Sequence, residues 1–217
     1  MPHALWPWNR PSPNIGVVSV RGNTAYKQVS DLPRLVSEAV ELAESMQFDN
    51  SCAPEQGRLL SVLASGRSGA RIGETGTGCG VGLAWMIEAT DQDTSFVSIE
   101  IDAARAAAAA DFYRDFPNVQ VVEGSWQRLI EHAPFDLLVL DGGGKGKDPA
   151  IDSPIDLGDG WLAMGGMVVL DDFIPAGQPG AEQHDPAREH WLNHPCLKAT
   201  EVRLSPTLAT IIGVRTR

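Results

Sequence analysis

Short apolar segments alternate with longer amphipathic segments along most of the chain from about residue 70 onward. Segment 135–141 is apolar enough to be a strand that is buried on both faces of a sheet, and 95–100 also has the composition of a strand. Segment 103–116, which lies between them, is rich in alanine, the best helix former. Strands and helices that alternate at this spacing predict a parallel sheet. Further strands are expected around Ile72 and at 119–122 and 167–170, with a short helix at 126–131.

The last third of the chain departs from this alternation. Residues 151–163 contain Pro154, Gly158 and Gly160, so the connection there is expected to be short or irregular rather than a full helix. After a helix near 187–192, the apolar runs 199–204 and 208–214 flank a Ser-Pro-Thr turn and predict an antiparallel hairpin. We therefore expect an α/β fold with a doubly wound, mostly parallel seven-stranded sheet that ends in this hairpin.

The N-terminal region divides into an arm and two leading helices. Residues 1–30 hold four prolines and two tryptophans, Trp6 and Trp8, and cannot form a core of their own. We expect these tryptophans to pack on the domain, although covering the active site or meeting a second subunit are alternatives. Apolar residues at helical spacing predict helices from Asp31 and from 51–55, within 31–69. The predicted domain is 31–217.

The stretch Ala70–Gly82 contains five glycines between a short apolar run and an apolar helical run. Such a stretch predicts a strand, a tight turn and a helix with backbone exposed to a ligand. A dinucleotide fingerprint would need glycine where Val81 stands, and no Gly-Lys-Ser/Thr of a P-loop follows. Glu74 would repel a pyrophosphate but suits a ligand that carries an ammonium and a sulfonium. The pattern Glu-x-Gly-x-Gly-x-Gly resembles motif I of the class I S-adenosylmethionine-dependent methyltransferases.

This resemblance implies a Rossmann-like fold and assigns cofactor contacts along the chain. Glu100 ends the second strand about twenty residues beyond the glycines, where a carboxylate accepts hydrogen bonds from the ribose hydroxyls. The alternative is a helix-capping acid beside Asp102. Val-Glu-Gly-Ser-Trp resembles the segment that contacts adenine, although Trp126 is equally well read as a core residue. The residues assigned to S-adenosylmethionine are Glu74, Gly76, Gly78, Gly80, Glu100, Ile101, Ser125, Trp126 and Asp141.

Acidic residues also follow the fourth and fifth strands. In the small catechol-type O-methyltransferases, which the chain resembles most, an Asp and an Asp-Asn pair at these places bind Mg²⁺. Here they are Asp141 and the pair Asp171-Asp172. Hard oxygen ligands suit Mg²⁺, and three clustered carboxylates need a counter-charge. The resemblance therefore implies a Mg²⁺ site, although methyltransferases that use no metal also carry an Asp after the fourth strand.

The general base is expected near the same acids. The family places a lysine three residues after the first metal-binding Asp, whereas this chain has Gly144 there and Lys145 next. We assign catalytic roles to Asp141 and Lys145, with Lys147 as another candidate and a flexible surface loop as the alternative. Histidines after the fifth strand are further candidates for the base. They are His184, His190 and His194.

Composition limits the partners. The 217 residues include 17 basic and 28 acidic residues, a net charge of −11, which argues against nucleic acid or an anionic membrane as partner. Three cysteines without CxxC spacing are expected to be reduced thiols, and neither a membrane-spanning run nor a secretory signal is evident. We expect a cytoplasmic enzyme with a small-molecule acceptor, and the tryptophans of the arm make a homodimer plausible.

These observations predict methyl transfer from S-adenosylmethionine to a hydroxyl of a small molecule, assisted by a divalent cation. Three alternatives stay open. A metal-independent methyltransferase would act on another nucleophile, and a non-catalytic module would bind S-adenosylmethionine without turnover. A nicotinamide-dependent oxidoreductase is disfavoured by Val81.

Overall fold

Seven strands form one sheet in the part of the chain that the computed structural model describes, which is residues 22–147, 152–181 and 184–217. The strand order is β3-β2-β1-β4-β5-β7-β6. Neighbours pair in parallel from β3 to β5, and β7 pairs antiparallel with both β5 and β6. The predicted seven-stranded, mostly parallel α/β sheet with a C-terminal antiparallel hairpin is confirmed. The strands are β1 Arg71–Thr75, β2 Ser95–Glu100, β3 Val119–Glu123, β4 Phe135–Leu140, β5 Leu162–Phe173, β6 Leu197–Arg203 and β7 Ala209–Arg215.

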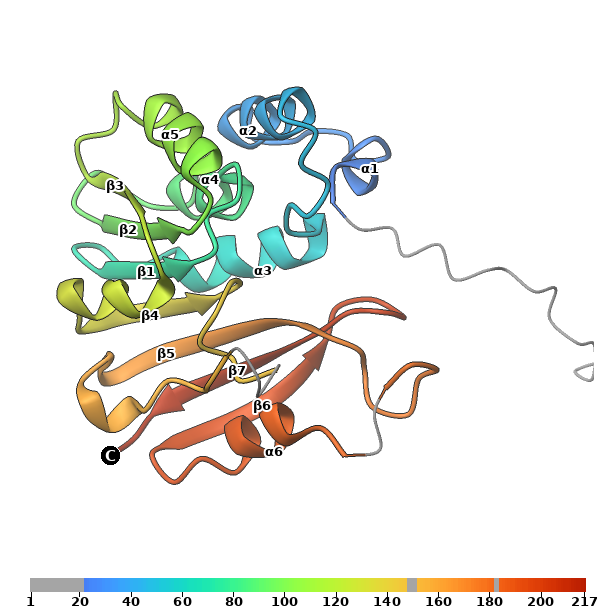
Figure 1. Ribbon diagram of the computed structural model, residues 1–217, viewed down its shortest axis with the longest axis vertical. Coiled ribbons are helices and arrows are strands. Elements are labelled where there is room, and N and C mark those ends of the chain that lie inside the picture. The colour runs from blue at the N-terminus through green and yellow to red at the C-terminus, as the bar shows by residue number, and fades with distance from the viewer. Residues whose placement is uncertain (1–21, 148–151, 182–183) are drawn as a thin grey trace, which may run out of the picture.

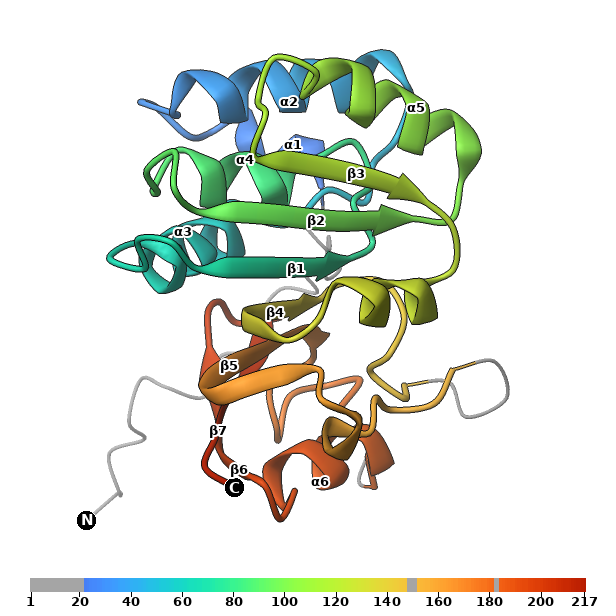
Figure 2. The same ribbon diagram turned by 90° about the vertical axis from the view of Figure 1, so that its left-hand side faces the viewer.

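Helices cover both faces of this sheet (Figures 1 and 2). The leading helices α2 and α3 pack on α4, which follows the glycine-rich stretch, while α6 packs on β6. No helix in the described residues is long and apolar enough to cross a membrane. The helices are α1 Asn23–Tyr26, α2 Arg34–Ser45, α3 Pro54–Ala64, α4 Val81–Ile87, α5 Ala103–Phe112 and α6 Pro186–Leu192, with 3₁₀ turns η1 Trp126–His132 and η2 Leu157–Asp159.

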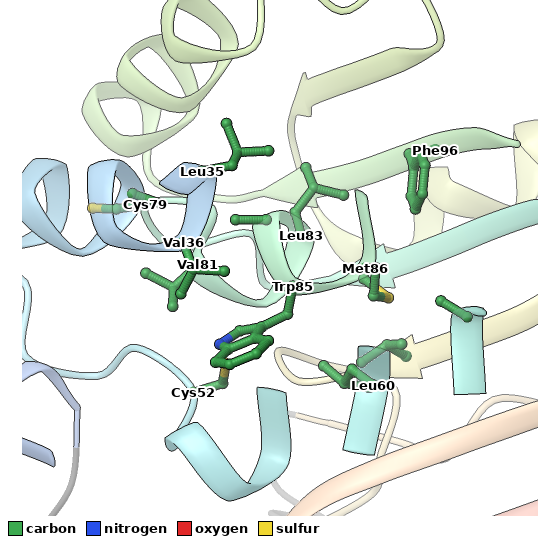
Figure 3. Close-up of a cluster of buried hydrophobic side chains, with 14 of the residues drawn as sticks. Leu35, Val36, Cys52, Leu60, Cys79, Val81, Leu83, Trp85, Met86 and Phe96 are labelled. Atoms are coloured by element: carbon green, nitrogen blue, oxygen red, sulfur yellow. The ribbon is translucent and has the colours of Figure 1, made fainter. Parts of the chain in front are cut away.

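The sheet separates two hydrophobic cores because successive side chains of a strand point to opposite faces. On β4, Leu137 and Val139 belong to the core beneath α2, α3 and α4, whereas Leu138 and Leu140 belong to the opposite core. Figure 3 shows the first core, in which the Trp85 indole lies among side chains from α2, α3 and α4. All four β4 residues are fully buried, as the apolar run in the sequence predicts.

The N-terminal helices are tied to the domain through polar contacts as well as packing. The Tyr26 hydroxyl donates to the Cys52 carbonyl oxygen at 2.9 Å and accepts from Trp85 Nε1 at 3.0 Å. Helix α2 begins at Arg34 rather than near Asp31, and its start is capped by a distant side chain: Glu88 Oε1, just past α4, accepts from the Leu35 amide at 2.8 Å. Tyr26, within the predicted arm 1–30, is therefore part of the first core, whereas Trp6 and Trp8 lie outside the described residues.

The connection between β4 and β5 contains only the 3₁₀ turn η2, so the predicted irregular crossover is confirmed for its described part. Strand β5 is longer than expected because it extends back to Leu162 through a register shift opposite Phe135. The parallel strands end on the side of the molecule where α1 and the β6–β7 turn lie (Figure 1). The acids at or just beyond the ends of β2, β4 and β5 are thereby brought to one edge.

Candidate functional site

A cavity of about 1020 Å³ lies at this edge. Its walls come from the loops after β1, β2, β4 and β5, from the segment that enters α3, and from the turn between β6 and β7. Of the residues predicted for the site, the cavity is lined by Gly76, Gly78, Glu100, Ile101, Trp126, Asp141, Asp171 and Asp172. It is not lined by Glu74, Gly80, Ser125 or Lys145.

The glycines of the β1–α4 loop act in different ways. Gly76 has φ of +85°, and a Cβ there would lie 2.5 Å from the Gly142 amide nitrogen, so only glycine lets the β1 and β4 loops cross at this point. Gly80 instead makes room for Tyr113, whose hydroxyl donates to the Gly80 carbonyl oxygen at 2.6 Å. The loop thus offers the cavity bare backbone at Gly76 and Gly78, while Gly80 serves packing.

Glu74 lies behind the loop rather than in the cavity. Its carboxyl is 2 % exposed and accepts from the Ser98 hydroxyl at 2.5 Å. The Ser98 oxygen lies 2.6 Å from the Thr77 hydroxyl, which does line the cavity. Burial raises the pKa of Glu74 to about 8, so this acid is largely neutral at pH 7. Glu74 therefore does not line the cavity as expected, and it is linked to the cavity wall only through Ser98 and Thr77.

Glu100 is held in place by donors on both carboxylate oxygens. Oε2 accepts from the Gly78 amide at 2.8 Å, and Oε1 accepts from the Asp102 amide at 2.9 Å and from Arg105 Nη2 at 2.8 Å. Asp102 itself caps α5 by accepting from the Arg105 amide. Glu100 therefore faces the cavity in one fixed orientation, and Asp102 rather than Glu100 is the capping acid.

The segment after β3 places Trp126 in the cavity and Ser125 outside it. Trp126 is half-buried, lies against Gly143, and has its ring centroid 6.1 Å from that of Trp161. It is therefore both a packing residue and part of the cavity wall. Ser125 is exposed and hydrogen-bonds to Gln127. Ile101 is 76 % exposed, a large apolar side chain that opens onto the cavity next to Glu100.

Asp141, just after β4, and Asp171 and Asp172, near the end of β5, form a cluster in which their nearest carboxylate oxygens lie within 4.8 Å of one another. Burial and the neighbouring Asp171 charge raise the pKa of Asp141 well above its ordinary value. Burial alone would raise the pKa of Asp171 too, but the Lys145 ammonium lowers it below the ordinary value. Asp172 is mostly exposed and has φ of +62°, a left-handed conformation that Asp tolerates. The cluster therefore contains one acid that favours its neutral form and one that is held as a carboxylate.

Lys145 provides the counter-charge of this cluster. Its ammonium is buried and donates to Asp171 Oδ1 and to the Asp141 carbonyl oxygen, each at 2.7 Å. Burial opposes the charge, but the carboxylates of Asp171, Asp141 and Asp172 hold the pKa of Lys145 above its ordinary value. An ammonium held in this way cannot take a proton from a substrate, so the predicted role of Lys145 as base is corrected to that of an ion-pair partner.

The same contact bears on Mg²⁺. Carboxylate oxygens at this spacing suit a hard divalent cation by their chemistry. However, the Asp171 carboxylate is already bound to an ammonium that also lies 3.8 Å from Asp172 Oδ2. The residues as arranged therefore do not fit a divalent cation, although the acids alone would.

The other predicted candidates for the base lie outside the cavity. Lys147 donates to the carbonyl oxygens of Asp171 and Asp172 at 2.9 and 2.5 Å, and burial together with the Lys145 charge lowers its pKa to about 8. His190 and His194 line a separate depression beside α6, and His184 is exposed next to Glu189. Of the residues named as catalytic, Asp141 is the one that faces the cavity.

Two polar side chains that the sequence did not single out face the same cavity. Gln56 is 1 % exposed, and within the described part of the chain neither its amide nitrogen nor its amide oxygen has a hydrogen-bond partner. The buried Ser51 hydroxyl also lacks a partner there. Unpaired buried polar groups are costly, so these atoms mark where a polar ligand would be held. Nothing in the sequence marks Gln56, because it stands in the first turn of α3 next to another polar residue, Glu55.

Comparison with known proteins indicates a methyltransferase. Residues 74–173 match the family model described as a methyltransferase domain. A protein of Mycobacterium tuberculosis named "Probable O-methyltransferase" is 26% identical over 170 residues, which are 73% of this chain and 72% of that protein. This relative extends the likeness beyond the residues that the family model matches.

Solved structures share the fold. The O-methyltransferase TomG of Streptomyces achromogenes, in complex with S-adenosylmethionine, has a TM-score of 0.68 at 20% identity, over 88% of this chain and 94% of that one. An O-methyltransferase from Bacillus cereus in complex with S-adenosylhomocysteine has a TM-score of 0.67 at 17% identity, over 88% and 95% of the two chains. The fold with its strand-end cavity is that of the class I S-adenosylmethionine-dependent methyltransferases. The matched methyltransferase domain and the O-methyltransferase relative bear out the resemblance seen in the sequence.

Proposed function

We propose that this chain transfers a methyl group from S-adenosylmethionine to a hydroxyl of a small molecule, with both bound in the one cavity at the strand ends. The observation that carries this proposal is the continuity of that cavity. It reaches from Glu100 and Ile101 to Asp141 and Asp172, so cofactor and acceptor can lie side by side. Its volume of about 1020 Å³ is at the upper end of the range for small-molecule sites.

The cofactor would occupy the half formed by β1 and β2. Glu100 would accept from the ribose hydroxyls, and Ile101 and Trp126 would offer apolar surfaces to the adenine. The polar end of the methionyl group carries a carboxylate and an ammonium, which need a donor and an acceptor. The unpaired amide of Gln56 offers both, and the Ser51 hydroxyl lies in the same wall.

The acceptor would lie beside β4 and β5. Phe173, Ile174 and Leu208 add apolar surface to the cavity lining, which also includes Asp141. The acceptor oxygen would attack the methyl carbon in line with the carbon–sulfur bond, which breaks and leaves its electron pair on the sulfur of S-adenosylhomocysteine. The raised pKa of Asp141 makes its ionised form a stronger base than an ordinary carboxylate, and in that form it would accept the hydroxyl proton. The fixed placement of the two reactants would supply much of the rate.

A Mg²⁺-assisted reaction is the second candidate, because the spacing of the three carboxylates suits a divalent cation once the Lys145 ammonium is displaced from Asp171. Persistence of activity in excess EDTA supports the first candidate, whereas its loss and its recovery on adding Mg²⁺ support the second. Because of the net charge of −11, a small molecule in the cytoplasm stays the proposed acceptor rather than a nucleic acid or a membrane.

The test is methyl transfer from radiolabelled S-adenosylmethionine to a panel of phenols and other hydroxyl compounds. We expect label in at least one acceptor, and we expect Asp141→Asn to lower kcat by about 10²- to 10⁴-fold. Asp156→Asn, an exposed acid outside the cavity, is the control. Binding of S-adenosylhomocysteine with no transfer to any acceptor would contradict the proposal.

A further inference from the structure

The ammonium of Lys145 contacts one oxygen from each residue of the acid cluster. It donates to the Asp141 carbonyl oxygen and to Asp171 Oδ1 at 2.7 Å, and Asp172 Oδ2 lies 3.8 Å away. A metal ion bound by these three residues would draw on their carboxylate oxygens, of which Lys145 contacts those of Asp171 and Asp172, and it reaches Asp141 through the backbone carbonyl oxygen. The ammonium of Lys145 therefore supplies the positive charge that the acid cluster needs.

The loop that carries Lys145 is fixed rather than free to swing. The amide groups of Gly144 and Gly146 donate to the two carboxylate oxygens of Asp152 at 2.7 and 2.8 Å. Trp191 Nε1 donates to the Lys145 carbonyl oxygen at 2.8 Å, and Trp191 is fully buried. The backbone on both sides of Lys145 is therefore anchored to other parts of the domain, and the side chain folds back over the end of β4.

Glycine at 144 and 146 makes this path possible. Their φ angles are +91° and +76°, which residues with a side chain rarely adopt. Gly144 also occupies the position at which the resembling family carries its lysine. Moving the lysine one residue further, between two glycines in left-handed conformations, turns its ammonium into the buried acid cluster.

We propose that Lys145 is the built-in cation of this cluster and that the site works without a divalent metal. The proposal rests on the function proposed above and specifies how its acids are held. A divalent ion bound to Asp171 and Asp172 would lie beside an ammonium that contacts the same carboxylates, and like charges repel. Lys147, whose ammonium donates to the carbonyl oxygens of Asp171 and Asp172, adds a second positive charge at this edge. Lys145 is thus a positioning residue, which orients the acids that face the acceptor.

Mn²⁺ binding measured by electron paramagnetic resonance tests this directly, because it requires neither cofactor nor acceptor. We expect the wild-type protein to bind no Mn²⁺ stoichiometrically at the cluster. Lys145→Met removes the ammonium but keeps a long side chain, and we expect this variant to gain one Mn²⁺ per chain. Lys198→Met, an exposed lysine on β6, is the matched control and should gain none. The gained ion should disappear again in the double variant Lys145→Met/Asp172→Asn.

Two results would overturn the proposal. One is a wild-type protein that binds one Mn²⁺ and loses it in Asp172→Asn, a reading that does not depend on any lysine variant. The other is a Lys145→Met variant that has the circular dichroism of the wild type and yet gains no ion. Titration with S-adenosylhomocysteine, run in parallel in EDTA, tests the cofactor site separately from the role of Lys145. Binding there with either result would overturn the role of Lys145 but leave the cofactor site intact.

Discussion

The two halves of the cavity are built in different ways. The half at β1 and β2 is made mainly of backbone: Gly76 and Gly78 leave the chain bare, and Glu100 is fixed by the Gly78 amide. The half at β4 and β5 is made of charged side chains, with Asp171 and Lys145 paired out of contact with solvent. A wall made of backbone keeps its shape with or without a ligand, whereas the arrangement of a charged cluster depends on which cation neutralises it. Variants in the two halves should therefore fail in different ways.

The largest effect is expected at the charged half. Asp171→Ala leaves the Lys145 ammonium buried without its carboxylate partner, which costs about 3–5 kcal/mol for pairs of this kind. Urea denaturation should show a corresponding loss in the free energy of unfolding. Asp159→Ala, an exposed acid in η2, should change it by less than about 0.5 kcal/mol. Equal stability of the two variants would mean that the pair does not hold this half together.

At the backbone half, Glu100→Gln should weaken ligand binding more than folding. The substitution removes a charge that would bind the ribose and that also fixes the glycine loop through Gly78. We expect the affinity for S-adenosylhomocysteine to fall by roughly 10- to 100-fold, as for one charge-assisted hydrogen bond. Glu123→Gln, an exposed acid at the end of the neighbouring strand β3, is the calorimetric control and should bind as the wild type does.

The buried carboxyl of Glu74 should make the stability of the protein depend on pH. Its folded-state pKa of about 8 is raised from an ordinary 4.5, so the native protein keeps a proton that the unfolded chain has released between these values. Its contribution makes stability fall as pH rises through this window, by up to about 1.4 kcal/mol per pH unit. Glu74→Gln cannot titrate and should show a shallower fall in urea denaturation between pH 5 and pH 8. Identical slopes for variant and wild type would show that the buried carboxyl is ionised in the fold.

The smallest expected effect is a gain in stability on replacing Gln56. Gln56→Met replaces an unpaired buried amide with an apolar side chain of similar length, so the ligand-free protein should become more stable by about 1 kcal/mol. The same variant should bind S-adenosylhomocysteine more weakly. Gln120→Met, on the exposed side of β3, should change neither quantity. A loss of stability in Gln56→Met would show that the amide is satisfied without a ligand.

The sequence predicted the backbone half better than the charged half. Glycine spacing and strand-end acids follow from local patterns, and the order of strands and helices they imply is the one observed. The position of Glu74 behind the loop depends on Ser98, 24 residues away, which no local pattern indicates. Lys145 was predicted to be the base because the family that the chain resembles carries a lysine one position earlier, at Gly144. Its ion pair with Asp171 spans 26 residues and needs two left-handed glycines, so only the folded chain reveals it.

The most direct test of the central claim is a calorimetric titration of the wild-type protein with S-adenosylhomocysteine in EDTA, with NAD⁺ titrated in parallel. The cavity at the strand ends predicts one molecule of S-adenosylhomocysteine per chain, weakened in Glu100→Gln, and no heat from NAD⁺. Absence of S-adenosylhomocysteine binding, or binding of NAD⁺ in its place, would contradict the assignment of this cavity.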